Sequence, residues 1–159
     1  MTTVIERIVT RWEPATDDAV EALVRACSVR SLSERFAAAH RLTPEAVLTR
    51  YRPWLLAGEA VVARVGGWPV GLLNLVDDPA RPRTTDLALL VADDAQRRGV
   101  ATGLLRHTLG APARAGWTVR ATVRADNRAA IGLLRGRRLG PTRLARLDPG
   151  QLTYEIAVP

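Results

Sequence analysis

The sequence contains no lysine, a single cysteine and only two histidines, and these shortages exclude several classes of protein. All 23 basic residues are arginine. Cys27 has no partner for an intramolecular disulfide, and His40 and His107 lie too far apart in the sequence to give metal-ligand spacing. No apolar run approaches the roughly 18 residues that cross a bilayer. The sequence therefore predicts no disulfide framework, no metal site and no membrane partner.

The N-terminal residues do not combine a basic region with an apolar core, which predicts the absence of a secretory signal and a cytoplasmic location. The formal net charge is +7, and such a surplus can attract an anionic partner. The arginines are spread along the chain, with one local cluster at Arg135, Arg137 and Arg138. We therefore do not expect nucleic acid among the partners. The sequence leaves open whether the chain forms a homodimer.

The length and composition predict a single domain over residues 1–159. A chain of 159 residues forms one compact unit that buries roughly 68–70% of its unfolded surface. Hydrophobic residues make up 47% of the chain and charged residues 25%, as in ordinary globular proteins. Cys27 falls within an apolar stripe at helical spacing, so we assign it to the core.

Changes between strand and helix periodicity predict an α/β fold. Strands are predicted over residues 4–10, 59–65, 69–76, 85–91 and 117–123, with two more on either side of residues 148–150. Helices are predicted over residues 17–29, from Thr43 until Pro53, from Gly99 and from Asn127. This order predicts a central mixed, twisted sheet of about six to seven strands with helices on both faces. Strands 85–91 and 117–123 should be parallel neighbours.

Two junctions carry most of the local information. Gly66-Gly67 lies between two predicted strands and permits the positive φ angles of a tight hairpin. The strand at residues 85–91 is followed by Gln96-Arg-Arg-Gly-Val-Ala101, where a helix begins. The free N–H groups and the dipole of a helix start favour an anion, and Gly99 lets a phosphate approach the main chain. Arg97 and Arg98 suit phosphate oxygens, although a solvated arginine pair remains the alternative interpretation.

The segment Gln96-Arg-Arg-Gly-Val-Ala101 resembles the Q/R-x-x-G-x-G/A signature of the GCN5-related N-acetyltransferases, the GNAT superfamily. The segment Asn127-Arg-Ala-Ala-Ile131 resembles the second, N-x-x-A, motif of that superfamily. The resemblance implies a coenzyme A site, with acetyl-CoA as co-substrate, and two central strands that separate to admit the pantetheine arm. Ser31-Leu-Ser-Glu-Arg-Phe36 is similar to a segment of the bacterial protein-lysine acetyltransferase branch.

The resemblance also implies which residues bind coenzyme A. Main-chain groups near Leu89 and Val91 would pair with the pantetheine arm, and the loop with the helix start would hold the pyrophosphate. Asn127 would be a further contact, and it is also a natural helix cap. The cofactor-binding residues expected on this basis are Leu89, Val91, Gln96, Arg97, Arg98, Gly99, Val100, Ala101, Thr102 and Asn127.

Amide formation from a thioester needs a neutral amine, and Asp86 is the candidate base. An alkyl amine of pKa about 10.4 is mostly protonated at pH 7, so a group that removes a proton assists the reaction. Asp86 is the only acid within its predicted strand, where the lysine-acetylating branch carries a glutamate with this role. A strand-end residue that caps a loop or faces solvent is the alternative, and Glu59, Asp77 and Asp78 could act through a water relay. By the same resemblance, a backbone N–H near Leu90 or Val91 would stabilise the oxyanion.

One position departs from the superfamily pattern. Many members carry a tyrosine in the helix after the asparagine, and here that position is Leu134, which cannot protonate the thiolate. The first hypothesis is an N-acetyltransferase that transfers acetyl to a primary amine by direct attack, with a protein lysine as one acceptor. The alternatives are a small-amine acetyltransferase, acting on an aminoglycoside, polyamine or amino acid, and a non-catalytic acyl-CoA-binding module.

Overall fold

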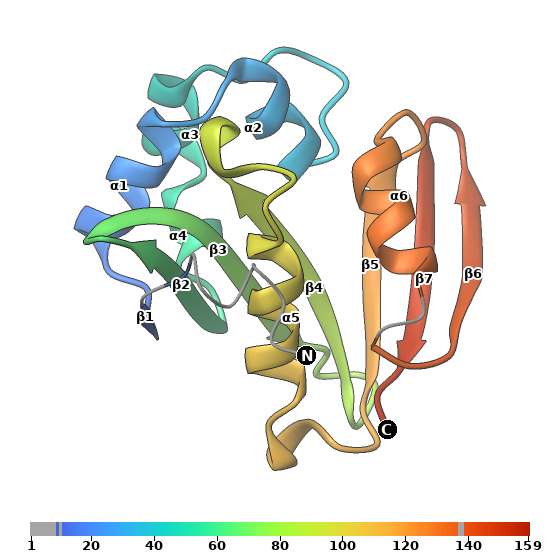
Figure 1. The fold of residues 1–159 in the computed structure, drawn as a ribbon. Helices are drawn as coiled ribbons and strands as arrows, with labels where there is room; N and C mark the ends of the chain where they lie inside the picture. The colour runs from blue at the N-terminus through green and yellow to red at the C-terminus, as the bar shows by residue number, and fades with distance from the viewer. Residues whose placement is uncertain (1–8, 10, 137–138) are drawn as a thin grey trace.

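The computed structural model describes residue 9 and residues 11–136 and 139–159. Their strands form one seven-stranded mixed sheet in the order β1-β2-β3-β4-β5-β7-β6 (Figure 1). Neighbouring strands are antiparallel except β4 and β5, which are parallel. The predicted mixed sheet and its parallel pair are confirmed. The strands are β1 (Arg11–Pro14), β2 (Glu59–Val65), β3 (Trp68–Asp77), β4 (Thr84–Val91), β5 (Thr118–Arg124), β6 (Thr142–Asp148) and β7 (Gln151–Ala157).

Both predicted hairpins are present. Gly66 and Gly67 have φ of 53° and 89° in the turn between β2 and β3. The second hairpin joins β6 to β7, with Gly150 at φ 74°. In contrast, most of the strand predicted over residues 4–10 lies outside the described residues, and the first described strand is β1, which pairs with β2.

In the described part of the chain, six α-helices accompany the sheet, and the segment before β2 contains more and shorter helices than its pattern predicts. The predicted helix over residues 17–29 is wrong in its extent, because α1 ends at Arg25 and Ser28 starts a new helix by accepting a hydrogen bond from the Ser31 N–H at 3.2 Å. The helix that follows Thr43 ends before Pro53, as expected, and a further short helix comes next. The helices are α1 (Asp17–Arg25), α2 (Val29–Arg35), α3 (Pro44–Arg50), α4 (Arg52–Leu55), α5 (Val100–Leu109) and α6 (Arg128–Arg135).

Helices cover both faces of the sheet, as predicted. Asn74 of β3 is hydrogen-bonded to Arg35 of α2, whereas a Cβ on Gly71 would meet Val100 and Leu104 of α5. These two β3 positions are three residues apart, so they face opposite sides of the sheet. Consequently α2 and α5 lie on opposite faces, with α1 also packing on β3. Their apolar residues form a continuous core that includes Cys27, 5% exposed. Among the described residues, no helix is long and apolar enough to span a membrane.

The parallel strands β4 and β5 pair over only part of their length. Register partners are Thr84 with Thr118, Thr85 with Val119, and Asp86 with Arg120. Beyond Asp86 the two strands separate, and Figure 1 shows the gap widening toward the carboxyl end of β4. The resemblance implied this separation, and it leaves one edge of β4 without a neighbouring strand from Leu87 onward.

The packing of α5 on the sheet can be tested at Gly71. A Cβ built there lies 2.6 Å from Val100 Cγ1 and 3.0 Å from Leu104 Cδ1. We expect Gly71→Ala to push α5 away from β3 and to lower the free energy of unfolding by about 1–3 kcal/mol in urea titrations. Gly132→Ala in α6 is the matched control, because no atom lies within 4 Å of its Cβ, and we expect a gain of about 0.5–1 kcal/mol. An unchanged stability for Gly71→Ala would contradict close packing of α5.

Candidate active site

The loop between β4 and α5 is shaped for a close approach to its main chain. After β4 the chain makes one 3₁₀ turn over Asp93–Ala95 and then turns into α5. Gly99 precedes the helix in the left-handed conformation, with φ 80°, and Arg97 also has a positive φ of 61°. Glycine adopts this conformation without the cost that a Cβ would impose. The local sequence therefore selects the turn that the signature predicts.

The first N–H groups of α5 are available to an anion. The first helical hydrogen bond runs from the Gly103 N–H to the Gly99 carbonyl, at 2.9 Å. Gly99 has no side chain to cap the helix, and within the described part of the chain the N–H groups of Val100, Ala101 and Thr102 have no hydrogen-bond partner. Three free N–H groups at the positive end of a helix dipole fit a pyrophosphate. Arg97 and Arg98 are exposed beside them, and their contact with coenzyme A stays a prediction.

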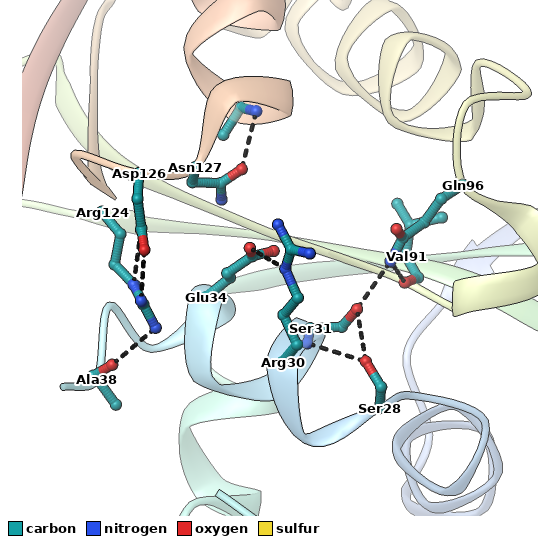
Figure 2. Close-up of polar contacts among 11 residues, drawn as sticks. Ser28, Arg30, Ser31, Glu34, Ala38, Val91, Gln96, Arg124, Asp126 and Asn127 are labelled. Carbon is teal, nitrogen blue, oxygen red and sulfur yellow. Dashed lines mark hydrogen bonds and ion pairs between the residues drawn. The ribbon is translucent and has the colours of Figure 1, made fainter. Parts of the chain in front are cut away.

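Gln96 links this loop to α2 and to the end of β4. Its Nε2 donates to Ser31 Oγ of α2 at 2.8 Å and to the Val91 carbonyl at the end of β4 at 3.1 Å (Figure 2). Asp93 adds a second link by accepting the Ser28 N–H at 2.8 Å. Burial raises the pKa of Asp93, but hydrogen bonds from Ser28, Ser31 and its own main chain together hold that pKa below its usual value. The Gln96 side chain thus positions the loop, and its direct contact with the cofactor remains a prediction.

The unpaired edge of β4 presents the main-chain groups of Leu89 and the N–H of Val91, whose carbonyl accepts from Gln96. The Thr84 carbonyl accepts a hydrogen bond from Asp78, and the Ala92 N–H donates to Val70, so even-numbered residues of this strand direct their polar groups toward β3. The register with β3 is unbroken between these positions. Because direction alternates along a strand, Leu89 and Val91 face the gap. An extended pantetheine arm could therefore pair with them as an added strand.

Asn127 lies across the gap from Gln96, at the start of α6 (Figure 2). Its Oδ1 accepts the Ala130 N–H at 3.1 Å, so it caps α6. The cap interpretation is therefore correct, and it leaves the amide Nδ2 for another partner. A contact between Nδ2 and coenzyme A remains a prediction.

Asp86 lines an open hollow of about 490 Å³ at the point where β4 and β5 separate. The hollow also borders β6 and β7, and its charged lining residues are Asp86, Glu155, Arg81, Arg120 and Arg146. Asp86 Oδ1 and Oδ2 accept hydrogen bonds from Arg120 at 3.0 and 3.3 Å. Arg120 was missed by the sequence reasoning, because only the parallel register shows that it stands beside Asp86.

The other candidate acids divide between the two faces of the sheet. Asp78 shares Arg120 with Asp86, with an Arg120 Nη2 to Asp78 Oδ2 distance of 2.8 Å. The Ala80 N–H, and after it Arg120, lower the pKa of Asp78. Glu59 and Asp77 instead bind Arg114, which follows α5, each at 2.8 Å. Asp77 and Asp86 are therefore held by different arginines, and only Asp86 among these acids lines the hollow.

Comparison with known proteins agrees with the family that the sequence motifs indicate. The model of the acetyltransferase (GNAT) family matches residues 26–140. The chain belongs to the GNAT acetyltransferase family. It is accordingly an N-acetyltransferase that uses acetyl-CoA, as the sequence motifs predicted. No curated protein sequence matches the chain significantly.

Solved structures share the GNAT fold over almost the whole chain. The GNAT domain of S. lividans PAT superposes with a TM-score of 0.71 at 24% identity, covering 93% of this chain and 90% of that domain. Diaminobutyrate acetyltransferase EctA from Paenibacillus lautus gives 0.66 at 16% identity, covering 93% and 94%. The Escherichia coli ribosomal-protein-S18-alanine N-acetyltransferase gives 0.63 at 17% identity, covering 93% of each chain. At these identities the likeness shows the fold alone.

Two residues bear on how this GNAT enzyme differs from others. Leu134 of α6 is 4% exposed, so its hydrocarbon side chain completes the core where many members have a tyrosine. Burial, and then the nearby Asp93, raises the pKa of Cys27 to about 12, so its thiol is not ionised near neutral pH.

Of the predicted arginine cluster, Arg137 and Arg138 lie outside the described residues. In the described part of the chain, no three His, Cys, Asp or Glu side chains are grouped to hold a metal.

The anchoring role of Gln96 can be measured by coenzyme A binding. Gln96→Ala removes two hydrogen bonds worth about 0.5–1.5 kcal/mol each, which frees the loop from α2 and β4. We expect the dissociation constant for coenzyme A, measured by calorimetry, to rise about tenfold. Gln151→Ala is the matched control, because it removes a glutamine hydrogen bond to Ala37 elsewhere in the fold, and it should change the constant less than twofold. Equal affinities for Gln96→Ala and the unaltered chain would argue against a positioned loop.

Proposed function

We propose that this chain transfers an acetyl group from acetyl-CoA to a primary amine by direct attack, with Asp86 as the base. The observation that carries the proposal is the place of Asp86, which lines an open hollow where β4 and β5 separate. An acceptor in that hollow would approach the thioester from the α2 face. No covalent acetyl-enzyme step is needed, and the un-ionised Cys27 argues against one.

The residues that would hold acetyl-CoA are the free N–H groups at the start of α5 and the open edge of β4. The bound cofactor supplies an activated acyl carbon. Within that arrangement the α5 dipole and the exposed Arg97 and Arg98 offset the pyrophosphate charge. The main-chain groups of Leu89 and Val91 would orient the pantetheine arm along β4.

Asp86 would remove a proton from the incoming ammonium group, directly or through water. Both carboxylate oxygens accept from Arg120, and each keeps a second lone pair that could take the proton. Arg120 keeps its second carboxylate, Asp78, throughout. The ion pair would therefore hold Asp86 in place while it accepts the proton.

The N–H of Leu89 is the best-placed donor for the developing oxyanion. The sequence suggested Leu90 or Val91, but the N–H of Leu90 is directed at β3 by the alternation of β4. At about 3.3 Å per residue, Leu89 lies about 10 Å along the strand from Asp86, and Val91 lies about 17 Å away. The shorter separation favours Leu89, because base, amine nitrogen and acyl carbon must lie close together in the reaction.

The leaving thiolate would depart without a tyrosine donor at position 134. A thiol pKa near 8.5 makes the thiolate a tolerable leaving group at neutral pH. The departure from the family pattern at Leu134 thus affects the rate of the step rather than its nature.

The charge and the open shape of the hollow favour some classes of amine acceptor over others. Three arginines and two carboxylates line it, so a polyamine would meet net positive charge. A protein lysine is favoured by the open shape, by the Ser31–Phe36 likeness and by the similarity to the domain of S. lividans PAT. The similarity to diaminobutyrate acetyltransferase supports a small amino acid as the second candidate.

The proposed base is tested by Asp86→Asn, which keeps the size of the side chain and removes its capacity to take a proton. We expect kcat in a thiol-release assay to fall by about 10²–10⁴, with coenzyme A affinity unchanged. Asp77→Asn is the matched control, because that ion-paired aspartate binds Arg114 instead, and it should retain activity within a few-fold. Full activity of Asp86→Asn would remove this residue from the mechanism.

A further inference from the structure

Arg35 is a charged residue that the proposed reaction does not use and that the protein leaves without a counter-ion. It ends α2 and belongs to the Ser31–Phe36 segment. Its Nη2 donates to Asn74 Oδ1 at 3.1 Å, and its Nε is shielded from solvent without a hydrogen-bond partner. Within residues 9, 11–136 and 139–159, no carboxylate forms an ion pair with it.

The guanidinium is nevertheless held firmly in one place. Asn74 is 1% exposed and donates its own amide hydrogens to the carbonyls of Leu55 and Ala57, at 3.0 and 3.1 Å, which directs its Oδ1 at Arg35. On the other side the Arg35 Cζ lies 4.8 Å from the centre of the Phe36 ring, and that ring packs on Tyr51. A buried amide and an aromatic pair therefore fix the group from two directions.

These contacts do not compensate the charge. Burial lowers the pKa of Arg35 to about 10, so the group stays protonated at neutral pH. A neutral amide and one ring face do not neutralise the guanidinium, so this partly buried charge has no carboxylate to offset its loss of hydration. A methionine or leucine at this position would avoid that cost. Among the described residues, the fold supplies no anion to the guanidinium.

The place of Arg35 in the fold indicates where such an anion would come from. Asn74 pairs with Ala88 of β4, on the α2 face and beside the unpaired edge of that strand. Ala88 lies two residues beyond Asp86, so the two share one face and are about 7 Å apart along the strand. The anion would thus stand on the same face of the sheet as the proposed base.

We propose that Arg35 binds a carboxylate borne by the amine acceptor, held by Asn74 as a positioning residue. This inference rests on the proposed function, because it names the acceptor as an amine that also carries a carboxylate. The net positive lining of the hollow, with Arg81 and Arg146 on its walls, favours the same class of acceptor. The carboxylate can belong to a free amino acid or to an acidic side chain next to a lysine in a peptide.

The test compares acceptors that differ only in the carboxylate. One arm sets L-lysine against 1,5-diaminopentane and 2,4-diaminobutyrate against 1,3-diaminopropane, and the other sets lysine peptides with a neighbouring glutamate against peptides with glutamine. We expect the carboxylate-bearing member of at least one arm to have a kcat/KM at least tenfold higher. The arm that responds identifies the source of the carboxylate, and equal values in both arms would overturn the proposal.

Arg35→Met removes the charge and keeps an apolar side chain of similar length. For the preferred acceptor we expect KM to rise about 10- to 100-fold with kcat within threefold, no change for the amine lacking a carboxylate, and unchanged coenzyme A affinity. Because an unpaired buried charge is lost, the melting temperature should stay the same or rise. Arg50→Met, which removes an exposed arginine of α3, should leave the kinetics unaltered. A lower melting temperature with uniform loss of activity would instead make Arg35 structural.

A binding measurement separates this inference from the proposed reaction. The shielded Arg35 Nε–H should give a slowly exchanging NMR signal, assigned by its loss in Arg35→Met. With coenzyme A present, L-lysine or the glutamate peptide should shift that signal, whereas diaminopentane should not. If no amine is acetylated but the shift occurs, the proposed function fails and the carboxylate site stands. If neither acceptor shifts the signal, the site is absent even where turnover is seen.

Discussion

The parallel pairing of β4 with β5 ends at Asp86 and Arg120, and each part of the proposed reaction is placed relative to that point. If the two strands stayed paired to their ends, the main-chain groups of Leu89 and Val91 would be satisfied by β5 and closed to any ligand. Because they separate, one edge of a buried strand becomes a binding surface without any special side chain. The ion pair between Asp86 and Arg120 spans the last paired position. It therefore joins the two strands where their hydrogen bonding stops.

The two faces of the sheet carry different parts of the proposed site. α5 and the loop before it, which are proposed to hold coenzyme A, lie on one face, and α2 lies on the other with the hollow proposed for the acceptor. Gln96 connects them, since its amide reaches both Ser31 of α2 and the end of β4. Arg114 binds its carboxylates, Glu59 and Asp77, on one face of the sheet. Arg120 binds Asp78 and Asp86 on the other face. Residues adjacent in sequence, such as Asp77 and Asp78, consequently serve different arginines.

Local chemistry explains what the sequence could predict. Gly66-Gly67 and Gly99 are required by positive φ angles, and Asn127 and Thr43 cap the helices that follow them. These features depend on neighbours within four residues, so they can be recognised in a single sequence. The cofactor loop was predictable for the same reason, because its turn and its free N–H groups are properties of one short segment.

Features that depend on distant contacts were not predictable. The break between α1 and α2 falls at Ser28, whose N–H donates to Asp93, 65 residues further along the chain. The role of Arg120 follows only from the register between β4 and β5, and the place of Arg35 only from the packing of α2 on β3. The N–H directions that favour Leu89 over Leu90 needed the pairing with β3. Each of these requires the tertiary fold.

The use of arginine at position 120 has a chemical consequence for an enzyme of this kind. A lysine there could form the same ion pair with Asp86, but its amine would stand beside an activated acyl group and a base. Deprotonated by Asp86, it would become an acceptor within the enzyme's own active site. The guanidinium of Arg120 stays protonated, since hydrogen bonds and charge from Asp86 and Asp78 raise its pKa further, and it is a poor nucleophile. With no lysine anywhere in the sequence, the chain offers no lysine side chain for self-acetylation.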